Sequence, residues 1–143
     1  MKRMLFFIVM AQVWCAALPG EGRALRPGDG KENPMYTVAD GSGNVYRFDG
    51  EVLSYNPVKA AESSSGVYDG GEPYSRTLSP ADSADLTALL EECLEKSPAE
   101  SGARPMGTWL VKREADGDTA MAVLDSSFGL LKTLENKLST TKK

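Results

Sequence analysis

Residues 79–98 read SPADSADLTALLEECLEKSP, and this stretch carries the clearest structural signal in the chain. Ser79 is a good helix N-cap, Pro80 suits the first helical position, and Asp82 occupies the place of a capping-box acid. Apolar residues then recur at helical spacing, namely Leu86, Leu89, Leu90, Cys93 and Leu94. The pattern predicts an amphipathic helix that ends at Ser97-Pro98.

Strand-forming segments precede this helix. Residues 35–38, 44–48 and 51–55 are rich in β-branched and aromatic side chains. Asp49-Gly50 separates the last two segments and predicts a type I′ hairpin turn, in which both residues have positive φ. After a long loop over residues 56–73, the segment 74–78 predicts a short returning strand.

A second hairpin and a second helix follow the first helix. Residues 107–113 and 119–124 are the expected arms of the hairpin, with Asp116-Gly117-Asp118 as the turn. Asp125 or Ser126 is the expected cap of a final helix. The apolar face of that helix would consist of Phe128, Leu131, Leu134 and Leu138.

These elements give the order β-β-β-β-α-β-β-α and predict an α+β fold. Because its strands are linked by hairpins, the sheet should be mainly antiparallel, with about five or six strands and both helices packed on one face. We expect residues 35–138 to form a single α+β domain and residues 139–143 a disordered tail.

The N-terminal residues have the pattern of a secretory signal peptide. A basic start at Met1-Lys2-Arg3 precedes an apolar run, and Ala16-Ala17 offers a small-residue cleavage point. Residues 1–17 are therefore the expected leader and residues 18–34, rich in Gly, Pro and charge, a flexible spacer. The protein should be exported to the periplasm or secreted, with no stable membrane span after cleavage.

Two alternatives to a cleaved leader stay open. An uncleaved membrane anchor is disfavoured because the apolar run is shorter than the roughly 18–20 residues that cross a bilayer. Lipidation of Cys15 is disfavoured because Trp14, a large residue, precedes the cysteine.

Composition narrows the classes of function. The chain has 16 basic and 20 acidic residues, and loss of Lys2 and Arg3 with the leader would lower the net charge from −4 to about −6. We therefore expect no nucleic-acid partner. The chain has no histidine, and cleavage would leave Cys93 as its single cysteine. Histidine-dependent catalysis, histidine zinc sites and thiolate clusters are excluded, and no cofactor is expected.

Three features suggest specific chemistry, and each has a simpler explanation. Asp40–Asn44 with Glu51 resembles the ligand spacing of a calcium loop, but Val45 occupies the position where such a loop bends at glycine, so a hairpin turn is favoured. Cys93 belongs to the apolar stripe of the helix, which favours a buried, inert thiol. Asp69, Glu72 and Tyr74 could serve a small carboxylate-based hydrolase, although loop carboxylates are usually only hydrated.

The favoured hypothesis is an exported non-enzymatic binding protein of the bacterial envelope or exterior. Its partner would be a protein, and an inhibitor or modulator of a secreted enzyme is one form of it; a self-associating homo-oligomer is another. Alternation sends Trp109 and Val111 to one face of the second hairpin and Leu110 to the other, and both faces are largely apolar.

Two helices can cover one sheet face, so the other face could form an apolar interaction patch, unless the 56–73 loop or the N-terminal strand covers it. The working surface would be this open sheet face together with the loop from Ser63 to Tyr74. The candidate binding residues are Tyr68, Tyr74, Trp109 and Val111.

Overall fold

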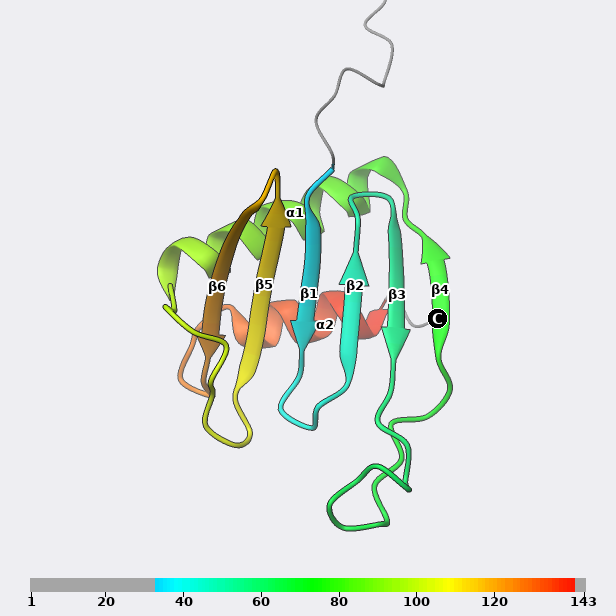
Figure 1. Cartoon of the computed structure of the whole chain (residues 1–143). Coiled ribbons are helices and arrows are strands. Elements are labelled where there is room, and N and C mark those ends of the chain that lie inside the picture. The colour runs from blue at the N-terminus through cyan, green and yellow to red at the C-terminus, as the bar shows by residue number, and fades with distance from the viewer. Residues whose placement is uncertain (1–32, 141–143) are drawn as a thin grey trace, which may run out of the picture.

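The computed structural model describes residues 33–140, so the expected leader, all but the end of the expected spacer, and residues 141–143 lie outside the described residues. The elements run in the predicted order (Figure 1). They are β1 (Met35–Ala39), β2 (Val45–Phe48), β3 (Val52–Asn56), β4 (Tyr74–Thr77), α1 (Pro80–Lys96), β5 (Trp109–Ala115), β6 (Asp118–Leu124) and α2 (Leu131–Thr140).

The strands form one six-stranded sheet in the order β4-β3-β2-β1-β5-β6, and every neighbouring pair is antiparallel. Both helices lie behind the sheet in Figure 1, and no helix of residues 33–140 lies in front of it. The predicted fold is therefore confirmed: an antiparallel α+β sheet with two helices on one face. We call the face in contact with α1 and α2 the covered face and the other the open face.

The core lies between the sheet and the helices. Alternate strand residues point into it, because successive side chains of a strand lie on opposite faces. The largest fully buried side chains are Tyr36, Phe48, Leu53, Leu86, Leu90, Leu124, Leu134 and Leu138. The helix members of this set belong to the apolar stripes that the sequence predicts. Burying those stripes is what fixes both helices to the same face.

The predicted cap of α1 is present in detail. The Ser79 hydroxyl accepts a hydrogen bond from the Asp82 backbone N–H at 3.1 Å, and it donates one to the Asp82 carboxylate at 2.7 Å.

An ion pair joins helix α1 to the sheet. Glu91 accepts hydrogen bonds from the Tyr36 hydroxyl at 2.5 Å and from the Arg113 guanidinium at 2.7 Å. These contacts fix the position of α1 over β1 and β5.

The type I′ turn predicted at Asp49-Gly50 was wrong. Gly50 has a φ of 94°, but Asp49 is not among the described residues with positive φ, and three residues separate β2 from β3. The Asp49 carboxylate instead accepts hydrogen bonds from the backbone N–H groups of Glu51 and Val52, and the Val52 bond holds the pKa of Asp49 below its usual value. The two-residue turn with paired positive φ occurs in the second hairpin, at Asp116 and Gly117, with φ of 49° and 80°.

The last helix begins and ends later than expected. The Asp125 side chain accepts hydrogen bonds from the Ser127 backbone N–H and hydroxyl, which makes a turn and not a helix start. Helix α2 then runs to Thr140, two residues beyond the expected end of the domain. Neither helix within residues 33–140 has the length and apolar character of a helix that crosses a bilayer.

Cys93 gives a first testable prediction. Its side chain is fully buried in α1, and burial raises the pKa of its thiol to about 11. The reactive thiolate is therefore scarce at neutral pH, so alkylation of Cys93 in the native chain should be at least about a hundredfold slower than in the denatured chain. Mass spectrometry of the peptide that contains Cys93, after timed alkylation, measures this ratio. Equal rates in both states would contradict the buried position.

Candidate interaction surface

The candidate residues on the second hairpin lie on the covered face. Val111 has no exposed surface and pairs with Val38 in the middle of the sheet. Trp109 is partly buried and packs against the same core. The prediction that they belong to an exposed working surface is therefore corrected. Alternation was right in placing both on one face, but α1 and α2 cover that face.

Tyr74 also points to the covered side. Its ring packs 5.2 Å from the ring of Tyr55, which in turn lies 4.8 Å from Tyr46. Burial raises the pKa of Tyr74, so its phenol stays protonated at neutral pH. Its hydroxyl is buried and has no hydrogen-bond partner among the described residues. Of the four predicted binding residues, only Tyr68 is exposed, to 39%.

The open face consists of the strand residues that alternate with the buried ones. Its members in the four strands β2, β1, β5 and β6 are Val45, Arg47, Met35, Thr37, Ala39, Leu110, Lys112, Glu114, Met121 and Val123. Its lower half is apolar, since the register places Ala39 between Val45 and Leu110. Its middle is polar, since Thr37 lies between Arg47 and Lys112.

The long loop over residues 57–73 lies beyond the lower end of β3 and β4 and does not cross the open face (Figure 1). Asn44, which is only 3% exposed, anchors it. The Asn44 side-chain amide donates to the Asp40 carboxylate at 2.7 Å and to the Tyr68 hydroxyl at 2.8 Å, and its oxygen accepts from the Val58 N–H at 3.0 Å. The exposed Tyr68 is therefore held in place.

Gly70 shows how closely the loop packs on this anchor. A Cβ atom at Gly70 would overlap the Asn44 side-chain oxygen and would lie 2.7 Å from the Pro57 Cβ. The Gly70 carbonyl also accepts a hydrogen bond from the Tyr55 hydroxyl at 2.8 Å. Only a residue without a side chain lets the loop approach the sheet this closely.

The segment between α1 and β5 covers one corner of the open face. It follows the outer edge of β6, where Ala99 donates to the Met121 carbonyl at 2.8 Å and the Ser97 hydroxyl to the Val123 carbonyl at 2.7 Å. Gly102 then lies over the side chains of Leu110 and Met121, within 3.7–3.9 Å of a Cβ placed on it. Neither the 56–73 loop nor the N-terminal strand, the two covers that the sequence suggested, lies over this corner. Among the described residues, the centre of the face is left uncovered between two loops.

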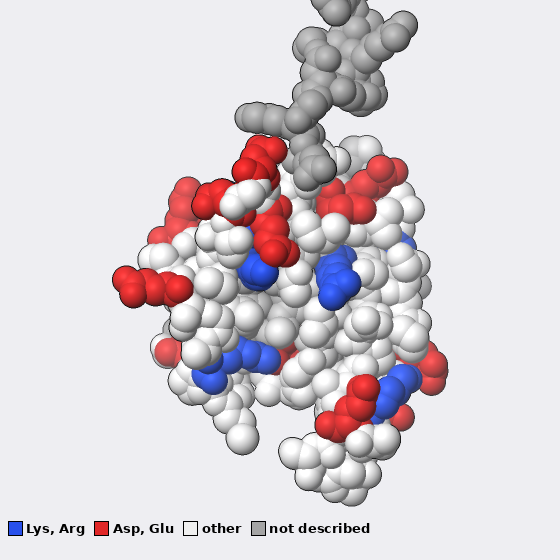
Figure 2. All heavy atoms as spheres, in the orientation of Figure 1, with Lys and Arg blue, Asp and Glu red and all other residues white. Residues whose placement is uncertain are grey.

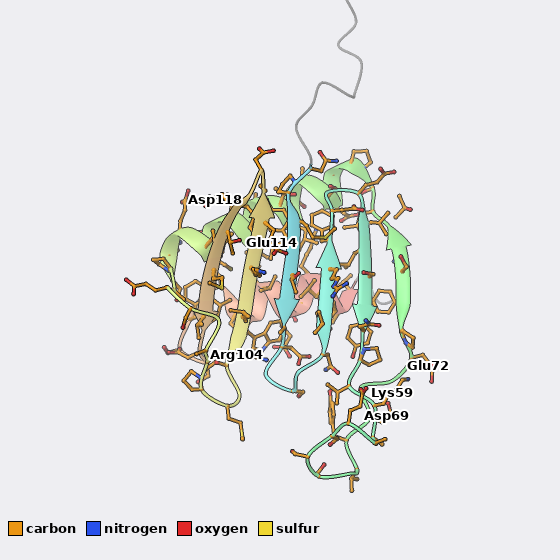
Figure 3. The ribbon with its side chains drawn as sticks, viewed as in Figure 1. Lys59, Asp69, Glu72, Arg104, Glu114 and Asp118 are labelled. Carbon is orange, nitrogen blue, oxygen red and sulfur yellow. The ribbon has the colours of Figure 1, made fainter. Side chains whose placement is uncertain are left out.

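Arg104 fixes this covering segment to the sheet. Its guanidinium donates to the Asp40 carbonyl at 3.0 Å and to the Thr108 carbonyl, at the lower end of β1 and β5 (Figure 3). Gly41 in the β1–β2 turn packs against the same segment, since a Cβ there would lie 2.7 Å from the Gly107 carbonyl oxygen. The tips of both loops are apolar and exposed: Met106 on one, Val67 on the other.

The proposed calcium loop does not assemble its ligands. The Asp40 carboxylate is occupied by the turn itself, with hydrogen bonds from the N–H groups of Ser42 and Asn44 and from the Asn44 side chain. Glu51 lies in the β2–β3 turn, at the opposite end of the strands. No group of three potential metal ligands occurs within the part of the chain that the structure describes.

The carboxylates considered for a hydrolase are exposed and separate from Tyr74. Asp69 accepts a hydrogen bond from the Gly71 N–H at 2.9 Å, and the Glu72 side chain is 92% exposed, 3.8 Å from the Lys59 ammonium (Figure 3). The Tyr74 hydroxyl, which is buried without a hydrogen-bond partner in residues 33–140, contacts neither carboxylate. The three side chains therefore do not converge.

A groove of about 690 Å³ lies on the helix side, between α1, α2 and the edge strand β4. Lys137 of α2 spans it, 3.1 Å from the carboxylates of both Asp82 and Asp85 on α1. Glu92, also in the groove, pairs with Lys96 at 2.5 Å. Because these carboxylates are already paired, the groove offers little net charge with which to recognise a ligand.

Comparison with known proteins gives no relative: no family model, no curated protein and no solved structure matches the chain. The site must therefore be assessed from its own residues. The sequence did not point to Arg47, Lys112 or Arg104, and it suggested Asn44 only as a member of the calcium-loop candidate. The first two could have been found, because the alternation that groups Trp109 with Val111 also groups Lys112 with Leu110 on the opposite face.

Proposed function

We propose that this chain is an exported, non-enzymatic binding protein of the bacterial envelope or exterior, and that it binds a partner protein. Its working surface is the centre of the open face together with the loop that carries Tyr68. A modulator of a secreted enzyme is one form of this function. The proposal for export rests on the leader pattern of residues 1–17.

One observation carries the proposal: within residues 33–140 both helices lie on one face of the sheet, and the centre of the other face lies uncovered between two anchored loops. The solvated face of an antiparallel sheet is usually polar. The lower half of this face is apolar instead, and an exposed apolar patch is typical of an interaction site. The anchoring adds support, because a loop held by buried hydrogen bonds presents Val67 and Tyr68 at low entropic cost to binding.

Capture of a partner by the immobilised chain tests the proposal. Extracts of the host envelope and medium are passed over the chain, and bound proteins are identified and then tested for direct binding in purified form. Ala39→Glu places a carboxylate in the apolar lower part of the open face, and Val67→Glu changes an exposed loop tip. Each should lower the affinity of a true partner by at least about tenfold.

Ala84→Glu is the matched control, because Ala84 is exposed on α1, behind the sheet. It should bind the partner as the unchanged chain does. If a purified partner binds Ala39→Glu and Val67→Glu as well as it binds Ala84→Glu, the working surface lies elsewhere. Turnover of a substrate by the purified chain, lost on changing one carboxylate, would contradict a non-enzymatic role.

A further inference from the structure

Two cations flank the central strand on the open face. The register pairs Thr37 with Arg47 on β2 and with Lys112 on β5. The three residues therefore form one row across the sheet, and two strand spacings separate the outer Cα atoms by about 10 Å. The row continues through Ser54 to Ser75 on one side and ends at Met121 on the other, and all three are uncharged. Figure 2 shows basic side chains near the middle of this face, with acidic side chains along its upper edge and at its lower right.

The two cations differ in their partners. The Lys112 ammonium lies 2.6 Å from the Glu114 carboxylate on the same strand. The Arg47 side chain is exposed, and among the described residues no ion pair reaches its guanidinium. The open face thus carries a net positive charge in a chain whose total charge is −4. The local sign is opposite to that of the molecule.

A hollow of about 400 Å³ lies beside Arg47, where the open face meets the 57–73 loop. Val45, Asn56, Pro57 and Pro73 contribute to its walls. Its two other charged residues are Lys59 and Glu62, and both have contacts within the loop. The Lys59 ammonium donates to the Gly71 carbonyl at 2.9 Å, and the Glu62 carboxylate accepts from the Lys59 N–H at 3.3 Å. Arg47 is the cation in this hollow that is left to bind a ligand.

We propose that the open face binds an acidic segment of the partner protein, with one carboxylate bound by Arg47 in the hollow and a neighbouring acidic group near Lys112. This inference rests on the proposed function and specifies the chemistry of its partner. The planar guanidinium of Arg47 can hold a carboxylate through two parallel hydrogen bonds. Val45, Ala39 and Leu110, below the row, supply apolar contact for the rest of the segment.

The charge around the row favours an acidic peptide over a larger polyanion. Glu114 and Asp118 lie toward the upper end of β5 and β6, and Asp69 and Glu72 lie on the loop below β3 and β4 (Figure 3). A nucleic acid needs several phosphate contacts in succession, and an anionic membrane surface needs a wide basic patch. Two cations between acidic rims fit neither, but they fit two carboxylates of a short segment.

Titration of the full chain with a designed peptide tests the inference. The probe is a hexapeptide of alternating Glu and Val with blocked ends, and a Lys-Val hexapeptide is its matched counterpart. Nuclear magnetic resonance should show the Glu peptide shifting backbone amides of β1, β2 and β5 and the side-chain signal of Arg47. The shifts should weaken with added salt, because the pair is partly exposed. The Lys peptide should leave these signals unchanged.

Arg47→Gln should weaken binding of the Glu peptide by about fivefold. Arg76→Gln is the control, since it removes the same charge from the covered side of β4 and should have little effect. The inference is overturned if the Glu peptide causes no shifts, if the Lys peptide causes the same shifts, if the two variants bind equally, or if the shifts map to the groove between α1 and α2.

The failure of this inference can be separated from that of the proposed function. If Ala39→Glu loses binding of a purified partner and Arg47→Gln retains it, the proposed function stands and the acidic recognition is overturned. If Ala39→Glu, Val67→Glu and Arg47→Gln all retain binding of the partner, both proposals are overturned.

Discussion

Val111→Asp is expected to lower the free energy of unfolding severely. Val111 has no exposed surface and lies on β5, paired with Val38 of the central strand β1 and with Ala122 of β6. A carboxylate there would be buried among apolar side chains with no cation provided for it, at a cost of about 5 kcal/mol. Because domains of this size have a total stability of about 5–15 kcal/mol, this cost is at least a third of the folding free energy. Circular dichroism and urea unfolding measure the effect.

Val45→Asp is the matched control. It makes the same chemical change in the same sheet, but Val45 lies on the open face and is partly exposed. The carboxylate can stay hydrated there, so the free energy of unfolding should fall by no more than about 1 kcal/mol. If the two variants were equally stable, the assignment of covered and open faces would be wrong.

The fold was predictable because its signals are local. The N-cap at Ser79 and the apolar stripe of α1 are properties of adjacent turns of one helix, and both occur as expected. The β1–β2, β2–β3 and β5–β6 pairs are likewise joined by short turns, whereas the pairing of β1 with β5 that unites the sheet joins distant segments. The detail that failed was also local. A type I′ turn requires a positive φ at Asp49. The Asp49 carboxylate instead closes the turn by accepting hydrogen bonds from the backbone N–H groups of Glu51 and Val52, and Asp49 does not have a positive φ.

The face that the helices cover could not be predicted from the second hairpin, because both of its faces are apolar. Met121 and Val123 lie on the open face, while Ala122 and Leu124 lie in the core. Which set is buried depends on where α1 packs, and that depends on distant contacts. The contact of Glu91 with Tyr36 and Arg113 joins residues 22 and 55 positions apart. Such a pairing leaves no periodic pattern in the sequence.

The loops of the candidate surface were hardest to predict. Gly and Ser residues in the 57–73 segment indicate a loop, but its position depends on Asn44, which precedes β2. An asparagine beside a glycine is typical of a turn, and nothing in its neighbours shows that its side chain is buried. The position of Gly102 over Leu110 was equally hard to predict, because it depends on how the segment after α1 crosses β6.

Asn44→Leu is expected to loosen the 57–73 loop and to lower the free energy of unfolding by about 3 kcal/mol. Leucine has the branched shape of asparagine and the same number of side-chain heavy atoms, but its two methyl groups are bulkier and form no hydrogen bonds, so the change removes the hydrogen bonds and crowds the site. The Val58 N–H would lose its acceptor, and the Asp40 carboxylate and Tyr68 hydroxyl would each lose a donor. Each buried polar group left unpaired costs about 1–3 kcal/mol, less where water can reach it.

Two further variants test whether the destabilisation comes from the lost Asn44 hydrogen bonds or simply from replacing a polar side chain. Asn56→Leu changes an exposed asparagine at the end of β3 and should cost less than about 0.5 kcal/mol. Tyr68→Phe removes one of the three bonds and should cost about 1 kcal/mol.

Limited proteolysis should cut the 57–73 loop faster in Asn44→Leu than in Asn56→Leu or Tyr68→Phe. Because the Tyr68 hydroxyl is held by Asn44, Asn44→Leu should also weaken binding of the partner protein without altering the open face. Equal stability of Asn44→Leu and Asn56→Leu would show that the loop is positioned by other contacts.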